Sequence, residues 1–211
     1  MTVLLKTRIS RPKLGAQLLY RDALIQRLEY NSSKRLILIL AASGFGKTTL
    51  VSQWLESKAR KHAWISLDKD CNHFSTFLSY FVHAIDKISP GFSKNIQRYL
   101  NFQKLPEVDE ITATLTNELI DFQEHFILVL DDYQWVNDLR IHHFLDELLK
   151  YPPSILHLVI ISRRDPPLIL GRMRLYDQMH LIRGKDLIFG VDEILELNRI
   201  INKRELSPEL V

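Results

Sequence analysis

The sequence predicts an α/β fold, in which a parallel sheet lies between two layers of helices. The first observation is a set of short runs rich in Ile, Val and Leu, at residues 35–42, 62–67, 126–130 and 156–162. Runs that are apolar throughout are typical of strands covered on both faces, as in a parallel sheet. The second observation is that longer segments with apolar residues at helical spacing separate these runs. Strands that alternate with such helices form right-handed crossover units.

The elements can be predicted in order along the chain. The first dozen residues look extended, and residues 21–30 are expected to form a short helix before the first strand. Four longer helices with an apolar face are expected over residues 47–59, 73–88, 108–122 and 139–149.

The last part of the chain gives weaker signals. A fifth strand is expected at residues 179–183, with the segment 186–189 following it. Asp138 is expected to cap the helix at 139–149, and Asp192 a C-terminal helix, because carboxylates accept hydrogen bonds from the free amides of a helix start.

Composition narrows the class of protein. The chain has 211 residues, 46% of them hydrophobic, which suits one globular domain with a substantial core. A net charge of +3 without a dense Lys/Arg cluster does not favour a nucleic acid as partner. The single cysteine, Cys71, excludes an internal disulfide framework and fits a reducing, cytoplasmic setting. No signal peptide is expected, and no membrane span, because no apolar run reaches about 18 residues.

A phosphate-binding loop is predicted between the first strand and the next helix. The segment reads Ala41-Ala42-Ser43-Gly44-Phe45-Gly46-Lys47-Thr48, and an alanine stands where the strict pattern opens with glycine. The two glycines allow successive N–H groups to point into one concavity, to which the helix adds the positive end of its dipole. Lys47 supplies a charge for the β- and γ-phosphates, and the Thr48 hydroxyl is a ligand suited to Mg²⁺. We assign nucleotide binding to this loop and to Thr49.

Two further strands end in polar residues. The run at 126–130 is followed by Asp131 and Asp132, at the edge of a parallel sheet where ligands bind. Asp131 is the candidate partner of Mg²⁺, and Asp132 is placed to orient or deprotonate an attacking water. The run at 156–162 is followed by Arg163, which could reach the γ-phosphate, although an arginine that leaves a strand is as often solvated.

The conspicuous aromatic residues are interpreted as core. Trp54, Trp64 and Trp135 lie within or beside predicted elements and are expected to pack there. The aromatic stripe formed by Phe74, Phe77, Tyr80 and Phe81 is more typical of a packed helix face than of a ligand site.

Taken together, these segments resemble the nucleotide-binding domain of the MalT-like, LuxR-family ATP-dependent transcription activators, which are STAND P-loop ATPases. The resemblance rests on "KTRISRP" at 6–12, "AASGFGKTTLVSQW" at 41–54, "LVLDDYQWV" at 128–136 and "LVIISRRDPPL" at 158–168. It covers nearly the whole chain. It implies a five-stranded parallel sheet in the RecA/AAA-like ASCE order, sandwiched between helices.

The resemblance also implies roles for individual residues. Lys47, Asp132 and Arg163 would act in catalysis, with Asp132 in place of the Glu common in related ATPases and Arg163 as the sensor arginine. Thr48 and Asp131 would hold Mg²⁺. Arg11, Pro12 and Arg21 would lie near the adenine and ribose.

The family further implies a domain plan. Residues 1–30 would contribute to the nucleotide site, residues 31–190 would form the P-loop core, and residues 191–211 would begin a link to a helical arm. Family members switch between an ADP-bound resting form and an ATP-bound form that self-associates, and they continue into a winged-helix domain, a ligand sensor and a helix-turn-helix. We therefore expect a slowly hydrolysing ATP/ADP switch domain without direct DNA binding.

Two other functions stay open at this point. The chain could be a stand-alone P-loop ATPase or kinase that acts on a separate substrate, although no arginine-rich lid is evident between Asp132 and Arg163. It could also be an interaction module whose ADP is purely structural. Nucleotide turnover, with and without an added acceptor, separates these alternatives.

Overall fold

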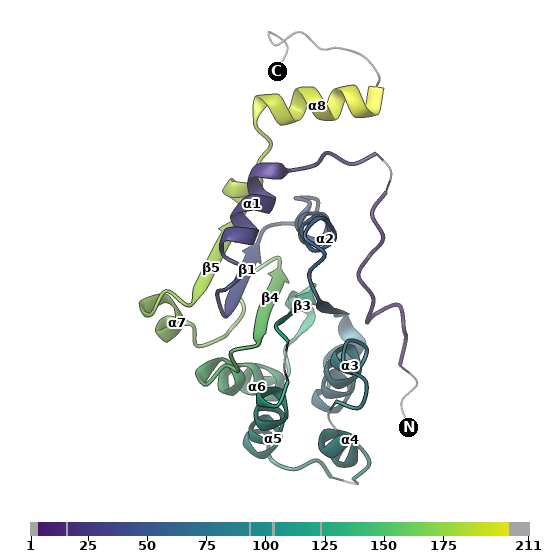
Figure 1. Cartoon of the computed structure of the whole chain (residues 1–211), viewed down its shortest axis with the longest axis vertical. Coiled ribbons are helices and arrows are strands. Elements are labelled where there is room, and N and C mark those ends of the chain that lie inside the picture. The colour runs from purple at the N-terminus through teal and green to yellow at the C-terminus, as the bar shows by residue number, and fades with distance from the viewer. Residues whose placement is uncertain (1–3, 16, 93, 103, 123, 203–211) are drawn as a thin grey trace.

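The computed structural model describes residues 4–15, 17–92, 94–102, 104–122 and 124–202, and it is built around a five-stranded sheet (Figure 1). The strands are β1 Leu36–Leu40, β2 His62–Ser66, β3 Phe126–Asp131, β4 Leu156–Ser162 and β5 Met179–Arg183. Their order is β2-β3-β4-β1-β5, and each neighbouring pair is parallel. The predicted parallel α/β sheet and its order are therefore confirmed.

Helices connect the strands, and most lie where helical spacing predicts them. They are α1 Asp22–Tyr30, α2 Lys47–Ser57, α3 Phe74–Asp86, α4 Lys94–Leu100, α5 Val108–Ile120, α6 Leu139–Lys150, α7 Gly171–Leu175 and α8 Val191–Asn202. Short 3₁₀ turns follow three strands: η1 Lys69–Cys71, η2 Tyr133–Trp135 and η3 Gly184–Leu187. We did not predict α4 and α7, because helices of one or two turns are too short to show a period.

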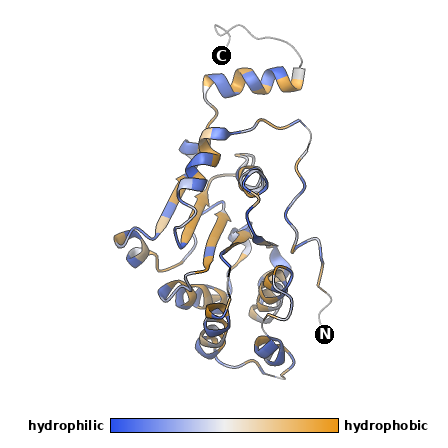
Figure 2. Cartoon of the chain, in the orientation of Figure 1, coloured by the Kyte–Doolittle hydropathy of each residue, from blue (hydrophilic) through white to orange (hydrophobic). Residues whose placement is uncertain are grey.

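The core has two parts, one on each face of the sheet. On one face, α1 and α2 pack Ile25, Leu28, Leu50 and Trp54 against alternate strand residues such as Ile37 and Val129. On the other face, helices α3 to α6 pack against the intervening residues, such as Leu38 and Leu128. Figure 2 shows the result: the central strands β1 and β4 are mostly hydrophobic, whereas the helices carry both kinds of residue. This pattern explains why every residue of β1 is buried.

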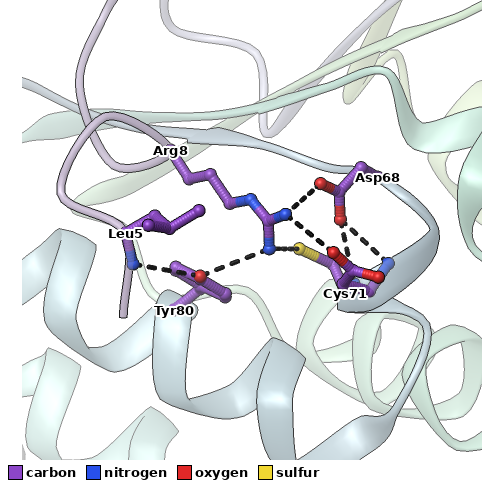
Figure 3. A network of polar contacts seen from close by, with 6 residues as sticks. Leu5, Arg8, Asp68, Cys71 and Tyr80 are labelled. Atoms are coloured by element: carbon purple, nitrogen blue, oxygen red, sulfur yellow. Dashed lines mark hydrogen bonds and ion pairs between the residues drawn. The ribbon is translucent and has the colours of Figure 1, made fainter. Parts of the chain in front are cut away.

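An N-terminal strap, residues 4–12, runs along the β2 side of the molecule. We expected an extended segment, but residues 6–9 form a turn, in which the Arg8 N–H donates to Leu5 O at 3.0 Å. The turn is held by contacts with residues that are distant in the sequence. The Arg8 guanidinium points inward and pairs with Asp68 and Asp70, and it also donates to the Tyr80 hydroxyl at 3.3 Å (Figure 3). Local sequence patterns do not register such contacts.

The strap also protects an edge of the sheet. The Ser66 N–H donates to Arg8 O at 2.8 Å, so the strap pairs with the last residue of the edge strand β2. Lys87, which follows α3, donates to Ile9 O at 3.0 Å and to the Ser10 hydroxyl at 2.9 Å. The carboxyl end of this edge strand is therefore covered, and a covered strand end is not free to pair with another chain.

One of the two predicted helix caps is confirmed. Asp138 Oδ1 accepts from the Arg140 N–H at 3.0 Å at the start of α6, and its Oδ2 accepts from the Phe74 N–H at 3.1 Å at the start of α3. The cap predicted at Asp192 is wrong, because α8 begins one residue earlier, at Val191. There the Gly190 N–H donates to Glu193 instead, at 3.0 Å. Residues 203–211 of the predicted C-terminal segment lie outside the described residues.

The aromatic residues follow the expectation with one exception. Trp54 and Trp64 are fully buried, as is the α3 stripe of Phe74, Phe77, Tyr80 and Phe81. Trp135 is 45% exposed, so the prediction that it packs in the core is wrong. It lies on η2, beyond the carboxyl end of β3, where the sheet no longer offers a covered face. No helix in the described part of the chain is both long and apolar enough to cross a bilayer.

Candidate functional site

The loop between β1 and α2 has the backbone that the sequence predicts. Gly44 and Gly46 have φ angles of +88° and +72°, a region that residues with a Cβ rarely adopt. Within the described residues, the N–H groups of residues 42–47 donate to no protein acceptor. The first backbone N–H after the loop with a partner in the described chain is that of Leu50, which donates to Gly46 O at 2.8 Å and begins the ladder of α2. The loop therefore presents a series of free donors at a helix N-terminus, which is an anion site.

Lys47 lies at the start of α2, with its side chain turned back onto the loop. Its Nζ donates to Ala42 O at 2.8 Å, and the residue is only 8% exposed. Burial lowers the pKa of Lys47, and the positive charge of Arg163 lowers it further, while Asp132 and Asp131 oppose both effects. Three predicted site residues, contributed by the ends of β3 and β4, thus act electrostatically on this one ammonium group.

Thr48 and Asp131 meet directly. The Thr48 hydroxyl lies 3.1 Å from Oδ1 and 3.0 Å from Oδ2 of Asp131, and one of these two oxygens accepts its proton. Asp131 is the last residue of β3 and is 3% exposed. Burial, with a smaller contribution from the neighbouring charge of Asp132, raises the pKa of Asp131 to about 6, although the Thr48 hydroxyl, the Asp132 N–H and Lys47 favour the charged form. The fold therefore holds the Asp131 carboxylate next to the Thr48 hydroxyl in a buried position that disfavours its negative charge.

Asp132 occupies a strained position next to this pair. Its φ is +59°, which is uncommon for a residue other than glycine and is found at functional sites. The conformation turns the chain from β3 into η2. Asp132 is half-buried whereas Asp131 is buried, so the two adjacent carboxylates have different surroundings.

Gln134 joins the acidic pair to the end of β4, a contact that we did not predict. Its Nε2 donates to Asp132 Oδ1 at 2.7 Å, and its Oε1 accepts from the Arg163 N–H at 3.1 Å. The carbonyl of Gln134 also accepts from Arg164 Nη2 at 3.1 Å. No sequence motif indicates this role, because the partners lie up to 30 residues away. The Arg163 side chain itself is exposed and makes no hydrogen bond within the described residues.

These residues fit a magnesium–phosphate group. The free amides and Lys47 offer donors and positive charge for phosphate oxygens, and Thr48 and Asp131 offer the oxygen ligands that Mg²⁺ prefers. Protein sites for Mg²⁺ commonly supply one or two oxygens and leave the remainder to phosphates and water. The raised pKa of Asp131 is a further sign of fit, because a cation at this carboxylate would relieve the cost of its buried charge.

The predicted base-proximal residues lie in other contacts. Arg21 is 8% exposed, and it donates to both carboxylate oxygens of Glu193 at 2.8 and 2.9 Å and to the carbonyl of Leu187 at 2.8 Å. Its guanidinium also lies 4.6 Å from the centre of the Phe189 ring. Arg21 thus ties the start of α1 to the segment that leads into α8, and its role near a base stays a prediction.

Arg11, which the sequence also predicts near the base, lies in contact with α2. Arg11 donates to Ser52 O at 3.1 Å and to Glu56 at 3.0 Å, so the strap next to Pro12 is fastened along α2. A Cβ added to Gly184 would lie 3.6 Å from both Ala41 and Phe45. The chain after β5 therefore packs against the phosphate loop, and a methyl group at Gly184 would lie in ordinary van der Waals contact with it.

Comparisons with known proteins concern the family and the fold of the chain. The family described as "AAA ATPase domain" matches residues 17–161. The chain is 32% identical over 191 residues to "HTH-type transcriptional regulator MalT" of Klebsiella pneumoniae, a match that covers 90% of this chain and 21% of that protein. The chain thus spans about a fifth of the length of this curated relative.

Two solved structures share the fold. The first is a Signal Transduction ATPase with Numerous Domains (STAND) protein with a tetratricopeptide repeat sensor from Pyrococcus horikoshii, with a TM-score of 0.63 and 19% identity over 96% of this chain and 28% of that one. The second is Cdc6p from Pyrobaculum aerophilum, with a TM-score of 0.61 and 17% identity over 97% of this chain and 55% of that one. At these identities the likeness concerns the fold alone.

Proposed function

The chain belongs to the AAA ATPase domain family, and from this premise we propose that it is a nucleotide-operated switch, which binds ATP or ADP with Mg²⁺ and hydrolyses ATP slowly. The observation that carries the proposal is the Thr48 hydroxyl placed 3.0–3.1 Å from both oxygens of buried Asp131, beside a loop of free amides. A hydroxyl and a carboxylate at this position would hold Mg²⁺, which neutralises phosphate charge when it is bound.

Each residue of the site has a defined task in this proposal. The amides of residues 42–47 and Lys47 would bind the phosphate oxygens, and Thr49 would extend this contact along α2. Asp132 would orient or deprotonate the attacking water, and its side chain is one methylene shorter than that of the usual Glu. A shorter reach to the water agrees with slow turnover and with a timing role.

Arg163 would respond to the γ-phosphate. Its side chain is exposed, while its N–H is fixed by Gln134. A movement of this arginine toward a bound γ-phosphate would pull on the chain that reaches Asp132 through Gln134. Contacts of this kind can order or release neighbouring segments and so give a switch a global output.

The name and length of the relative suggest the biological setting. The relative from Klebsiella is called a transcriptional regulator, and this chain matches about a fifth of it. We propose that this domain serves as one module of a cytoplasmic activator, which self-associates in the ATP form and leaves DNA recognition to another domain. The net charge of only +3 supports the assignment of DNA recognition to another domain, because DNA-binding domains are commonly more basic.

Nucleotide identification tests the proposal. The protein should release ADP or ATP after denaturation, as measured by mass spectrometry, and added ATP should be converted to ADP over hours. Lys47→Ala should lose nucleotide affinity by tenfold or more, by an order-of-magnitude estimate for one charged contact, whereas Lys69→Ala, at an exposed lysine on η1, should bind as the unchanged chain does. Equal affinity for Lys47→Ala would refute the proposal. Turnover that requires an added acceptor would instead identify a kinase.

A further inference from the structure

A cluster of basic side chains lies at the opposite edge of the sheet from the phosphate loop. A cavity of about 610 Å³ opens at the amino ends of β1, β2, β3 and β4. Its polar lining includes six side chains that carry or can acquire positive charge: Arg35, Lys58, Arg60, Lys61, His125 and His157. Because all strands are parallel, their amino ends lie away from the phosphate loop, which follows the carboxyl end of β1. We name this cavity the amino-edge pocket.

The pocket carries more positive charge than its own structure neutralises. Arg60 pairs with Glu29, and Lys61 pairs with Glu124. Arg35 donates to the carbonyl of Ser154 at 2.6 Å, and neither Arg35 nor Lys58 forms an ion pair within the described residues. The ends of α1 and α2 border the pocket and contribute roughly half a negative charge each. Arg35, Lys58, Arg60 and Lys61 carry four positive charges, and Glu29 and Glu124 carry two negative ones. With the two helix ends included, the pocket keeps an excess of roughly one positive charge.

Two histidines can add to this charge. His157 Nδ1 lies 3.0 Å from the carbonyl of Lys34, which can only accept, so Nδ1 carries the hydrogen. In the neutral ring Nε2 is then an acceptor, and His125 Nδ1 lies 3.2 Å from it. Burial lowers the pKa of His157, and the charges of His125, Arg35 and Arg60 lower it further, against the Lys34 carbonyl. A bound anion would offset those charges and favour uptake of a proton.

We propose that the amino-edge pocket binds the phosphate group of a small phosphorylated molecule, at a site independent of the phosphate loop. A phosphate monoester carries close to two negative charges near neutral pH, which matches one excess cation and one protonated histidine. The guanidinium of Arg35, the ammonium of Lys58 and the nearby serine hydroxyls are donors suited to phosphate oxygens. The volume is within the range of small-molecule sites, so the pocket has room for a phosphate group together with the molecule that carries it.

The test weakens anion binding at the phosphate loop and follows the amino-edge pocket through its own histidines. In a Lys47→Ala background, pyrophosphate is titrated into the full chain while the Cε1 protons of His125 and His157 are followed by NMR. We expect both resonances to shift with saturation, and the midpoint of the His157 titration to move to higher pH when pyrophosphate is bound. The additional change Arg35→Gln/Lys58→Gln should weaken binding by roughly tenfold or more, because two charge-assisted contacts are lost.

A control variant separates this effect from net charge. Lys69→Gln/Arg98→Gln removes the same two charges at exposed positions on η1 and α4, and it should bind pyrophosphate as the background protein does. Histidine resonances that do not respond, or equal affinity of the two double variants, would overturn the proposal. A response to duplex DNA with none to pyrophosphate would also overturn it, in favour of a nucleic-acid surface. None of these outcomes depends on nucleotide binding at the phosphate loop.

Discussion

Asp131 is the residue where stability and function are most clearly opposed. Its pKa of about 6 lies above the ordinary value of 3.8, because the carboxylate is buried and lies beside Asp132. The folded protein therefore binds a proton here more tightly than the unfolded chain does. The resulting cost to stability is absent below the ordinary pKa, grows as the pH rises between 3.8 and about 6, and is complete above that range.

Replacing Asp131 by Asn should therefore stabilise the ligand-free domain. The amide removes the buried charge and keeps an oxygen for the Thr48 hydroxyl. At about pH 7.5 the free energy of unfolding, measured with urea, should rise by up to about 3 kcal/mol, which follows from a pKa difference of about two units. The gain should vanish near pH 4. Asp121→Asn, at an exposed position after α5, should show no such pH dependence. A loss of stability at pH 7.5 would contradict this explanation.

Gln134 is the second residue whose role can be measured. If its amide holds Asp132 and the Arg163 backbone in register, Gln134→Ala should lower the rate of ATP hydrolysis by roughly tenfold and leave nucleotide affinity within about twofold. Single-turnover assays and equilibrium titration give the two quantities. Gln97→Ala on α4 serves as the control, since α4 packs away from the site. Equal losses of affinity and rate would indicate a general structural defect instead.

Among single residues, the sequence predicted those that would contact the phosphates or the metal directly. It did not predict residues that only position another side chain. Lys47, Thr48 and Asp131 could be predicted because a phosphate loop and an acidic strand end have fixed spacing and context. Gln134 could not, because an amide is equally common in solvated turns. Trp135 was wrongly placed in the core, because its position beyond the end of β3 depends on the turn at Asp132.

Among the elements, the N-terminal strap shows which structure local sequence patterns cannot predict. An isolated segment of this composition has no reason to turn. Its conformation depends on Arg8, which reaches Asp68 and Asp70 about sixty residues away and also lies 3.8 Å from Cys71 Sγ (Figure 3). Strands and long helices, in contrast, were predictable because burial on one or two faces leaves a period in the sequence. The helix α4 has only seven residues, which are too few to show a helical period.

Removing the Arg8 contacts should loosen the strap and expose Cys71. Arg8→Gln loses its ion pairs and most of its hydrogen bonds, and we expect the rate of Cys71 labelling by a thiol reagent to rise by roughly tenfold, since local opening costs less when charged contacts are absent. Loss of the Arg8 charge by itself would raise the thiol pKa and slow labelling, so a faster rate reports access. Lys6→Gln, an exposed strap residue, is the control. An unchanged rate would show that the strap stays docked without Arg8.

For the whole molecule, the sheet order brings the site together. β1, β3 and β4 are neighbours in the order β2-β3-β4-β1-β5, so the loop after β1, the acids after β3 and the arginine after β4 share one edge. Parallel crossovers could be predicted from alternating elements, whereas the exact order came from the family resemblance. The Arg21–Glu193 contact, which joins the two ends of the chain across 172 positions, left no local signal.

The most direct test of the account is the dependence of nucleotide affinity on Mg²⁺ in the unchanged chain and in Thr48→Val. The variant keeps the shape of the side chain and removes the hydroxyl that faces Asp131. By calorimetric titration, Mg²⁺ should strengthen nucleotide binding to the unchanged chain by roughly tenfold or more and have little effect on the variant. An equal gain in both proteins would show that Thr48 and Asp131 do not hold the metal, and the proposed site would be wrong.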